Sequence, residues 1–175
     1  MRQTKKITLS AILVALGVAF MALGAVFEVL DLSVCALVSL LVVFVYLEIG
    51  SPYTWLVWIC TSLISALIFP GSILWVEYSL VFGIYPIIKG YIERVPSRIL
   101  WWILKLAFFN AVIWALFSVV EFVIGVRFFD GDSLIWNAAI YLLMNFAFIV
   151  YDLFITAMVR VYYERFRKRF VRFLK

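Results

Sequence analysis

The sequence predicts an all-α protein that crosses a membrane several times. Hydrophobic residues make up 67% of the 175 residues, and only 14% are charged. The apolar residues form several runs of about 20, the length that a helix needs to cross a hydrocarbon core roughly 30 Å thick. A β-barrel, the other architecture that spans lipid, would alternate polar and apolar residues, whereas the run 39–46 does not alternate. We therefore expect a helical bundle.

Turns and charges divide the chain into about six spans, which form a single transmembrane domain over residues 1–175. Glycine and proline interrupt the apolar runs at 50–52, 70–71 and 95–97, and an acidic turn occupies 130–132. The short connections predict that consecutive helices are antiparallel neighbours. The predicted spans are approximately 7–29, 33–49, 53–69, 74–92 (which contains Pro86), 99–126 and 134–161, and a basic tail follows at 162–175.

The N-terminal segment imitates a signal peptide. Basic residues precede an apolar stretch, and the small residues at 22–25 resemble a cleavage site. The apolar run at 7–29 is longer than an ordinary signal core, however, and five more spans follow it. We expect it to be retained as the first helix.

The distribution of basic residues predicts that both termini are cytoplasmic. Lysine and arginine favour the cytoplasmic side of membrane proteins. With six spans, the N-terminus, the loop between spans four and five, and the tail all fall on one side. That side carries Arg2, Lys5, Lys6, Lys89, Arg94, Arg98, Arg165, Arg167, Lys168, Arg169, Arg172 and Lys175, and the opposite side carries Glu28, Asp31, Glu77, Asp130, Asp132 and one arginine, Arg127. A multi-pass protein of the plasma membrane is expected, with a tail that contacts anionic lipid or docks a partner protein.

Several classes of function lack support in the sequence. The net charge is +5, but the basic residues lie at predicted membrane edges, so we expect no nucleic-acid binding. The chain has no histidine, and it has no Gly-rich phosphate loop, metal-binding run or nucleophile elbow. Cys35 and Cys60 lie in apolar runs and are expected to be small core residues. We predict neither enzymatic activity, nor a cofactor, nor a metal site.

One group of polar residues lies in the half of the predicted spans nearer the cytoplasm. Polar groups inside the membrane are costly and usually face a partner or a cavity. We expect ion pairs that fix helix packing, formed by Lys105 or Lys89 with Asp152 or Glu48.

A second group lies from the midplane outward and predicts a ligand pocket that opens to the outside. Glu77 and Glu121 fall at similar depth on consecutive spans, where two like charges repel in a poorly solvated cavity. This arrangement favours a small, neutral-to-cationic organic ligand, although interfacial glutamates that simply reach water are the alternative. The predicted ligand-binding residues are Glu77, Tyr78, Asn110, Glu121, Asn137, Tyr141 and Asn145.

Span one carries a row of small residues. Ala11, Ala15 and Ala19 recur every four residues, and Gly17 extends the small surface. Such a row lets another helix approach closely. The helix that approaches is either one of this protein's own spans or a partner subunit.

The segment 6–16, with its alanines, resembles the opening of the substrate-binding S components of energy-coupling factor (ECF) transporters. Span six, with Tyr151 and Asp152 before a basic end, is also similar. The resemblance implies a subunit that binds a vitamin or metal on the outer side. It also implies docking through the span-one alanines, with Ala11 and Ala15 matching the motif, onto a transmembrane coupling subunit that joins cytoplasmic ATPases.

Two features expected of some members of that family are absent, and two further segments have no assigned role. The N-terminal histidine of the nickel and cobalt members is absent, and no vitamin-specific pattern is present. The segments 85–93 and 105–110 look like a family signature without an assigned activity.

A protein of another class has a similar span count. Proteins resembling the rod-shape-determining membrane subunit are scaffolds for cell-wall synthesis and transport nothing. A deep outer pocket lined by Glu77, Glu121, Asn137 and Asn145 would favour transport. A packed interior with an exposed apolar groove would favour the scaffold.

Overall fold

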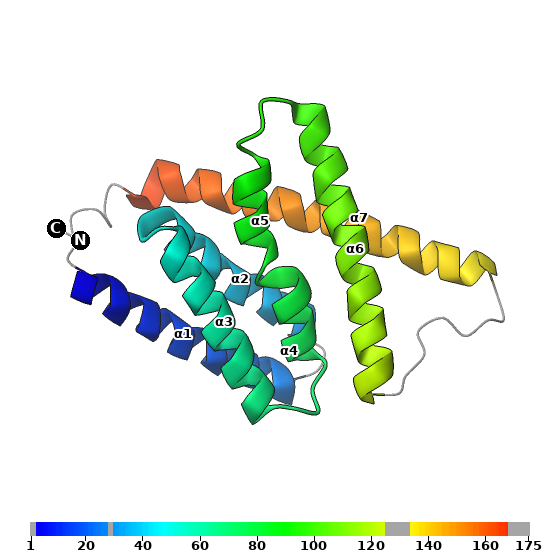
Figure 1. The fold of residues 1–175 in the computed structure, drawn as a ribbon, viewed down its shortest axis with the longest axis horizontal. Coiled ribbons are helices and arrows are strands. Elements are labelled where there is room, and N and C mark those ends of the chain that lie inside the picture. Colours follow the sequence, from blue (N-terminus) through cyan, green and yellow to red (C-terminus); the bar gives the residue numbers. More distant parts are fainter. Residues whose placement is uncertain (1–2, 28–29, 125–133, 168–175) are drawn as a thin grey trace.

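The computed structural model describes residues 3–27, 30–124 and 134–167, and these segments contain helices and turns but no β-strand (Figure 1). The predicted all-α class is confirmed. Several residues used to predict orientation lie outside the described segments: Arg2, Glu28, Arg127, Asp130, Asp132 and the tail from Lys168. The helices are α1 (Gln3–Val26), α2 (Asp31–Glu48), α3 (Ser51–Ile68), α4 (Leu74–Glu77), α5 (Tyr85–Ile92), α6 (Arg98–Ile124) and α7 (Leu134–Val161), with π-helical turns η2 (Tyr78–Phe82) and η3 (Tyr162–Phe166).

Five of these helices, α1, α2, α3, α6 and α7, are long and apolar enough to cross a membrane. Only 22% to 39% of the residues in each apolar window are buried inside the protein, so most apolar side chains point outward. Phe122 on α6 and Ile135 on α7 are 90% and 83% exposed. A helix that is apolar all round and mostly uncovered by protein requires lipid around it. The chain is therefore a multi-pass membrane protein.

The predicted span 74–92 is interrupted, which corrects the expectation of one continuous helix. After α4, the backbone widens into η2, where the amide of Gly83 donates to the carbonyl of Tyr78 at 2.7 Å. Pro86 then lies in the first turn of α5. Proline has no amide hydrogen and is tolerated at the start of a helix, but it disrupts a helix interior. The segment consequently forms two short helices joined by a π-helical turn.

Both described ends of the chain lie at the same end of the bundle as the α2–α3 turn. Three contacts bring the start of α1, the end of η3 and the end of α5 to this position: Lys6 over the ring of Tyr53 (5.7 Å), Arg167 with Glu48 (3.8 Å) and Ser51 with Tyr91 (2.7 Å). This is the arrangement that an even number of spans, such as the six predicted, would give. We refer to this end as the α2–α3 end. Helix α4 starts at the opposite end, where α3 finishes.

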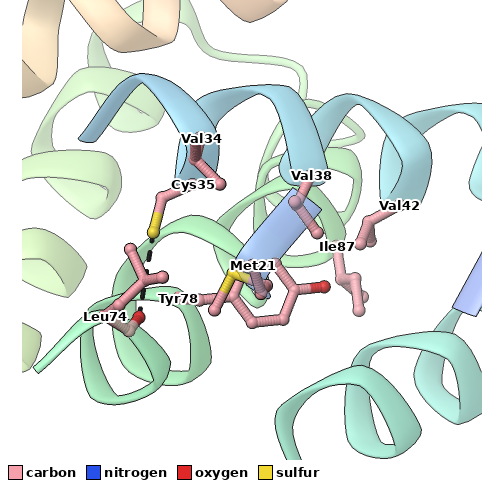
Figure 2. Close-up of a cluster of buried hydrophobic side chains, with 8 residues drawn as sticks. All are labelled: Met21, Val34, Cys35, Val38, Val42, Leu74, Tyr78 and Ile87. Atoms are coloured by element: carbon pink, nitrogen blue, oxygen red, sulfur yellow. Dashed lines mark hydrogen bonds between the residues drawn. The ribbon is translucent and has the colours of Figure 1, made fainter. Parts of the chain in front are cut away.

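The core between α1, α2, α3 and α4 is closely packed. Gly17 lets α1 approach α3, because a Cβ atom there would lie 3.3 Å from Thr61. Tyr78, which has no exposed surface, fills the centre of this core, and Cys35 donates to the carbonyl of Leu74 across it (Figure 2). The cluster consists of Met21, Val34, Cys35, Val38, Val42, Leu74, Tyr78 and Ile87.

A second core joins η2 and α5 to α6 and α7. Its aromatic rings are in contact: Phe109 stacks on Phe148 with centroids 4.1 Å apart, and Tyr151 meets Phe82 edge-on at 4.8 Å. In Figure 1, α6 crosses α7 at a steep angle, and this core lies where the two helices meet η2 and α5. Aromatic pairs of this kind fix ring positions as well as burying area.

Candidate functional site

Three helices meet at a buried carboxylate near the α2–α3 end. Asp152 of α7 accepts hydrogen bonds from Lys89 of α5 and from Lys105 of α6. The three residues are only 2% to 4% exposed. The predicted pairing of these lysines with Asp152 is confirmed.

Every charge of this cluster is partnered. Lys89 also donates to the carbonyl of Asp152 (3.0 Å) and to Thr156 (2.7 Å), and Lys105 donates to Glu93 (2.8 Å). The Tyr85 hydroxyl donates to Asp152. Two lysines and two carboxylates cancel formally, and no donor is left free for a ligand. The cluster therefore holds α5, α6 and α7 together and has no unpaired charged group that could bind a ligand.

The other expected acid, Glu48, lies elsewhere, 3.8 Å from the guanidinium of Arg167. Two cluster members, Tyr85 and Glu93, were missed from the sequence. A usable signal existed, because Tyr85 at the start of α5 and Glu93 directly after its end are each four residues from Lys89 and share its face. The segment 85–93 thus contributes Tyr85, Lys89 and Glu93 to the cluster, and the segment 105–110 contributes Lys105.

Three predicted ligand residues come together where α6 crosses α7. The side-chain amides of Asn110 and Asn145 face each other, each donating to the other at 3.3 Å. Tyr141 donates its hydroxyl to the Asn110 oxygen. Interhelical amide and hydroxyl bonds hold membrane helices together. These side chains use their hydrogen-bonding groups on one another, so their first role is to join the two helices.

The interruption after α4 frees backbone carbonyls, and side chains from other helices bind them. Trp58 of α3 donates to the carbonyl of Ser79 at 3.1 Å, and Tyr151 of α7 donates to the carbonyl of Phe82 at 3.1 Å. Irregular backbone at membrane depth requires such partners. Broken helices of this kind often form binding sites in membrane proteins.

A cavity of about 170 Å³ lies beside this interruption, between η2, α6 and α7. We call it the aromatic cavity. Among the described residues that line it, Glu77 alone is charged, and its Oε2 atom is buried without a hydrogen bond in the described part of the chain. The lining consists of Leu32, Glu77, Val81, Phe82, Phe109, Ile113, Leu116, Met144, Ala147, Phe148 and Tyr151.

The expected single pocket is divided between two cavities. Glu121 and Tyr141 line a second one, of about 330 Å³, and Ile113 lines both. Tyr78 is packed in the core rather than in either cavity. Asn137 is half-buried on α7 and lines neither.

The alanines of α1 face away from the protein. Ala11, Ala15 and Ala19 are exposed. The alternative that they pack against this protein's own spans is therefore wrong, since α1 buries another face, formed by Ser10, Leu13, Gly17, Met21 and Gly24.

An apolar groove of about 420 Å³ lies between α1, α2 and the end of α7. Its lining is almost entirely aliphatic and aromatic, and includes Leu9, Leu40, Phe44, Val159 and Phe166.

The cysteines differ in their surroundings. Cys35 is buried as expected, whereas Cys60 is exposed on α3, which corrects its expected place in the core. Within the described segments, no three His, Cys, Asp or Glu side chains gather closely enough to hold a metal ion.

Comparisons with protein-family models, with curated proteins and with solved structures found no match to this chain. The resemblance to ECF S components thus remains a prediction from the sequence, and the structure itself carries the functional argument.

Proposed function

We propose that this chain is the membrane-embedded substrate-binding subunit of an ECF-type importer. It binds a small ligand, such as a vitamin or another micronutrient, from the outer side of the plasma membrane. The observation that carries the proposal is the interrupted helix beside the aromatic cavity, where the Glu77 carboxylate has an oxygen without a partner. A carboxylate oxygen that is buried without a hydrogen bond is costly, and an ionisable group inside a membrane protein points to a functional site.

In this proposal the α2–α3 end faces the cytoplasm. The described basic residues near that end include Lys5, Arg94 and Arg165, and such residues favour the cytoplasmic side. The aromatic cavity, next to α4, then lies in the outer half, where an importer first meets its ligand.

The outward alanine face of α1 is the proposed docking surface for a membrane coupling subunit attached to cytoplasmic ATPases. Ala11, Ala15 and Ala19 form a shallow strip on which a second helix can pack closely. The same helix packs inward through Gly17, so α1 carries small residues on two faces.

The apolar groove favours a second candidate, a scaffold that resembles the rod-shape-determining membrane subunit. A groove lined by Leu40, Phe44 and Phe166 suits a helix of a neighbouring membrane protein. This candidate does not account for the carboxylate in the aromatic cavity, so transport is preferred.

Copurification from the native cell tests the choice. We expect a membrane coupling subunit and ATPase subunits to copurify with the tagged wild-type chain, and the double variant Ala11→Trp with Ala15→Trp to lose them through steric blockade. Ala111→Trp with Ala115→Trp is the matched control, because this pair has the same spacing and is also exposed, on α6.

Two results would count against the importer. One is retention of the ATPases by the α1 double variant. The other is copurification of cell-wall synthesis proteins without any ATPase, which would favour the scaffold.

A further inference from the structure

We propose that the aromatic cavity binds a small organic cation, a primary to quaternary ammonium compound, with Glu77 as its counter-ion. The inference rests on the proposed function, because it names the ligand class of that binding subunit. Three observations carry it: the unpartnered carboxylate oxygen, the aromatic lining and the fixed positions of the aromatic rings.

The first observation is that no cation in the described segments pairs with Glu77. None of the ion pairs in the described segments includes it, and the buried lysines, Lys89 and Lys105, contact Asp152 and Glu93 instead. A further acid, Asp31, precedes Leu32 of the cavity lining and adds negative potential. A buried charge needs a compensating charge, and a bound cation supplies it.

The second observation is the lining. Phe82, Phe109, Phe148 and Tyr151 contribute aromatic rings, whose faces carry partial negative charge and attract ammonium groups. An anionic ligand would meet both the carboxylate and these ring faces unfavourably. A polyhydroxylated neutral ligand would find few polar partners, because the Tyr151 hydroxyl already binds the Phe82 carbonyl.

The third observation is that the rings are held in place before any ligand arrives. Phe109 and Phe148 are stacked at 4.1 Å, and Tyr151 is fixed by its hydrogen bond to the carbonyl exposed at η2. A preorganised site has less conformational entropy to lose on binding. The volume of about 170 Å³ suits a molecule of choline size and is too small for a nucleotide.

The experiment measures ligand binding to the full chain in nanodiscs, by thermal unfolding and by calorimetry. The probes are methylammonium, tetramethylammonium and choline, together with 3,3-dimethylbutan-1-ol, the uncharged carbon analogue of choline. We expect at least one ammonium probe to raise the unfolding temperature saturably, and the uncharged analogue to bind at least about tenfold more weakly than choline.

Glu77→Gln should weaken binding of the ammonium probe by more than about tenfold, since it replaces the negative counter-ion with a neutral amide in a poorly solvated cavity, where charge–charge attraction is strong. Glu164→Gln is the matched control: it removes one negative charge from an exposed position in η3, at the other end of the bundle, and should leave affinity unchanged. If Glu77→Gln does not fold, Phe82→Leu provides the second variant and should weaken choline through loss of a ring.

Binding of none of the ammonium probes would overturn the proposal, as would equal binding of the uncharged analogue. Loss of binding in Glu121→Gln but not in Glu77→Gln would assign the ligand to the second cavity and overturn it too. Copurification through α1 is measured separately. If no ammonium compound binds, the copurification result is unaffected. If the α1 variant does not lose the ATPases, the measured ammonium binding is unaffected.

Discussion

At the scale of single residues, Asp152 decides how three helices meet. It is 2% exposed, and it accepts from both Lys89 and Lys105, which reach it from different helices. Buried ion pairs add little stability compared with apolar packing, but removing one partner leaves an uncompensated charge. The cluster therefore specifies the arrangement of α5, α6 and α7 more than it strengthens it.

Asp152→Asn should destabilise the protein by about 3–5 kcal/mol, because it leaves two buried lysines with one carboxylate. The free energy of unfolding, measured by denaturant titration in mixed micelles, checks this value. Glu93→Gln is the control, since that side chain is 35% exposed and water screens its loss. Equal destabilisation by the two substitutions would mean that Asp152 is not the organising charge.

At the scale of elements, the interrupted segment from α4 to α5 is the part of the fold that positions the cavity. A continuous helix would leave no free carbonyls, and Trp58 and Tyr151 would lose their acceptors at Ser79 and Phe82. Gly83 makes this geometry possible. A Cβ atom there would lie 2.6 Å from the Trp58 ring and 2.9 Å from the Tyr78 carbonyl oxygen.

Gly83→Ala should lower the free energy of unfolding by about 1–3 kcal/mol, because the added methyl group overpacks a fixed ring and a backbone carbonyl. The unfolding temperature in detergent, compared with that of wild type, is the measurement. Gly71→Ala is the matched control, since a Cβ atom there meets nothing within 4 Å. An unchanged stability of Gly83→Ala would show that η2 tolerates a side chain and that the interruption is not tightly packed.

At the scale of the whole molecule, the described start of α1 and end of η3 share one end of the bundle, as an even number of membrane crossings would require. The charge pattern predicts that this end is cytoplasmic.

A fluorescent protein fused after Lys175 should fluoresce, and alkaline phosphatase fused at the same position should be inactive, because this enzyme matures only outside the cytoplasm. Alkaline phosphatase fused after Gly71, at the opposite end of the bundle, should be active. The reverse pattern of activities would invert the orientation and place the aromatic cavity on the cytoplasmic side.

Sequence patterns were sufficient for the features that depend on local chemistry. The length of the apolar runs predicts the helical membrane class, and turn residues predict helix ends to within a few residues, as at Leu134–Val161. The sequence also predicted that Lys89 or Lys105 pairs with Asp152 or Glu48, because charges inside a membrane have few possible partners, and the structure selects Asp152.

The tertiary structure alone decided which predicted residues meet. Helices that are apolar all round carry no periodic signal of which face points inward, so the sequence gives no basis for separating Tyr78, buried in the core, from Glu77, at the aromatic cavity. The interruption at Gly83 depends on Trp58 and Tyr151, which come from distant helices. Local composition therefore determines that this chain crosses the membrane, whereas helix rotation and long-range hydrogen bonds determine where it holds its cavity.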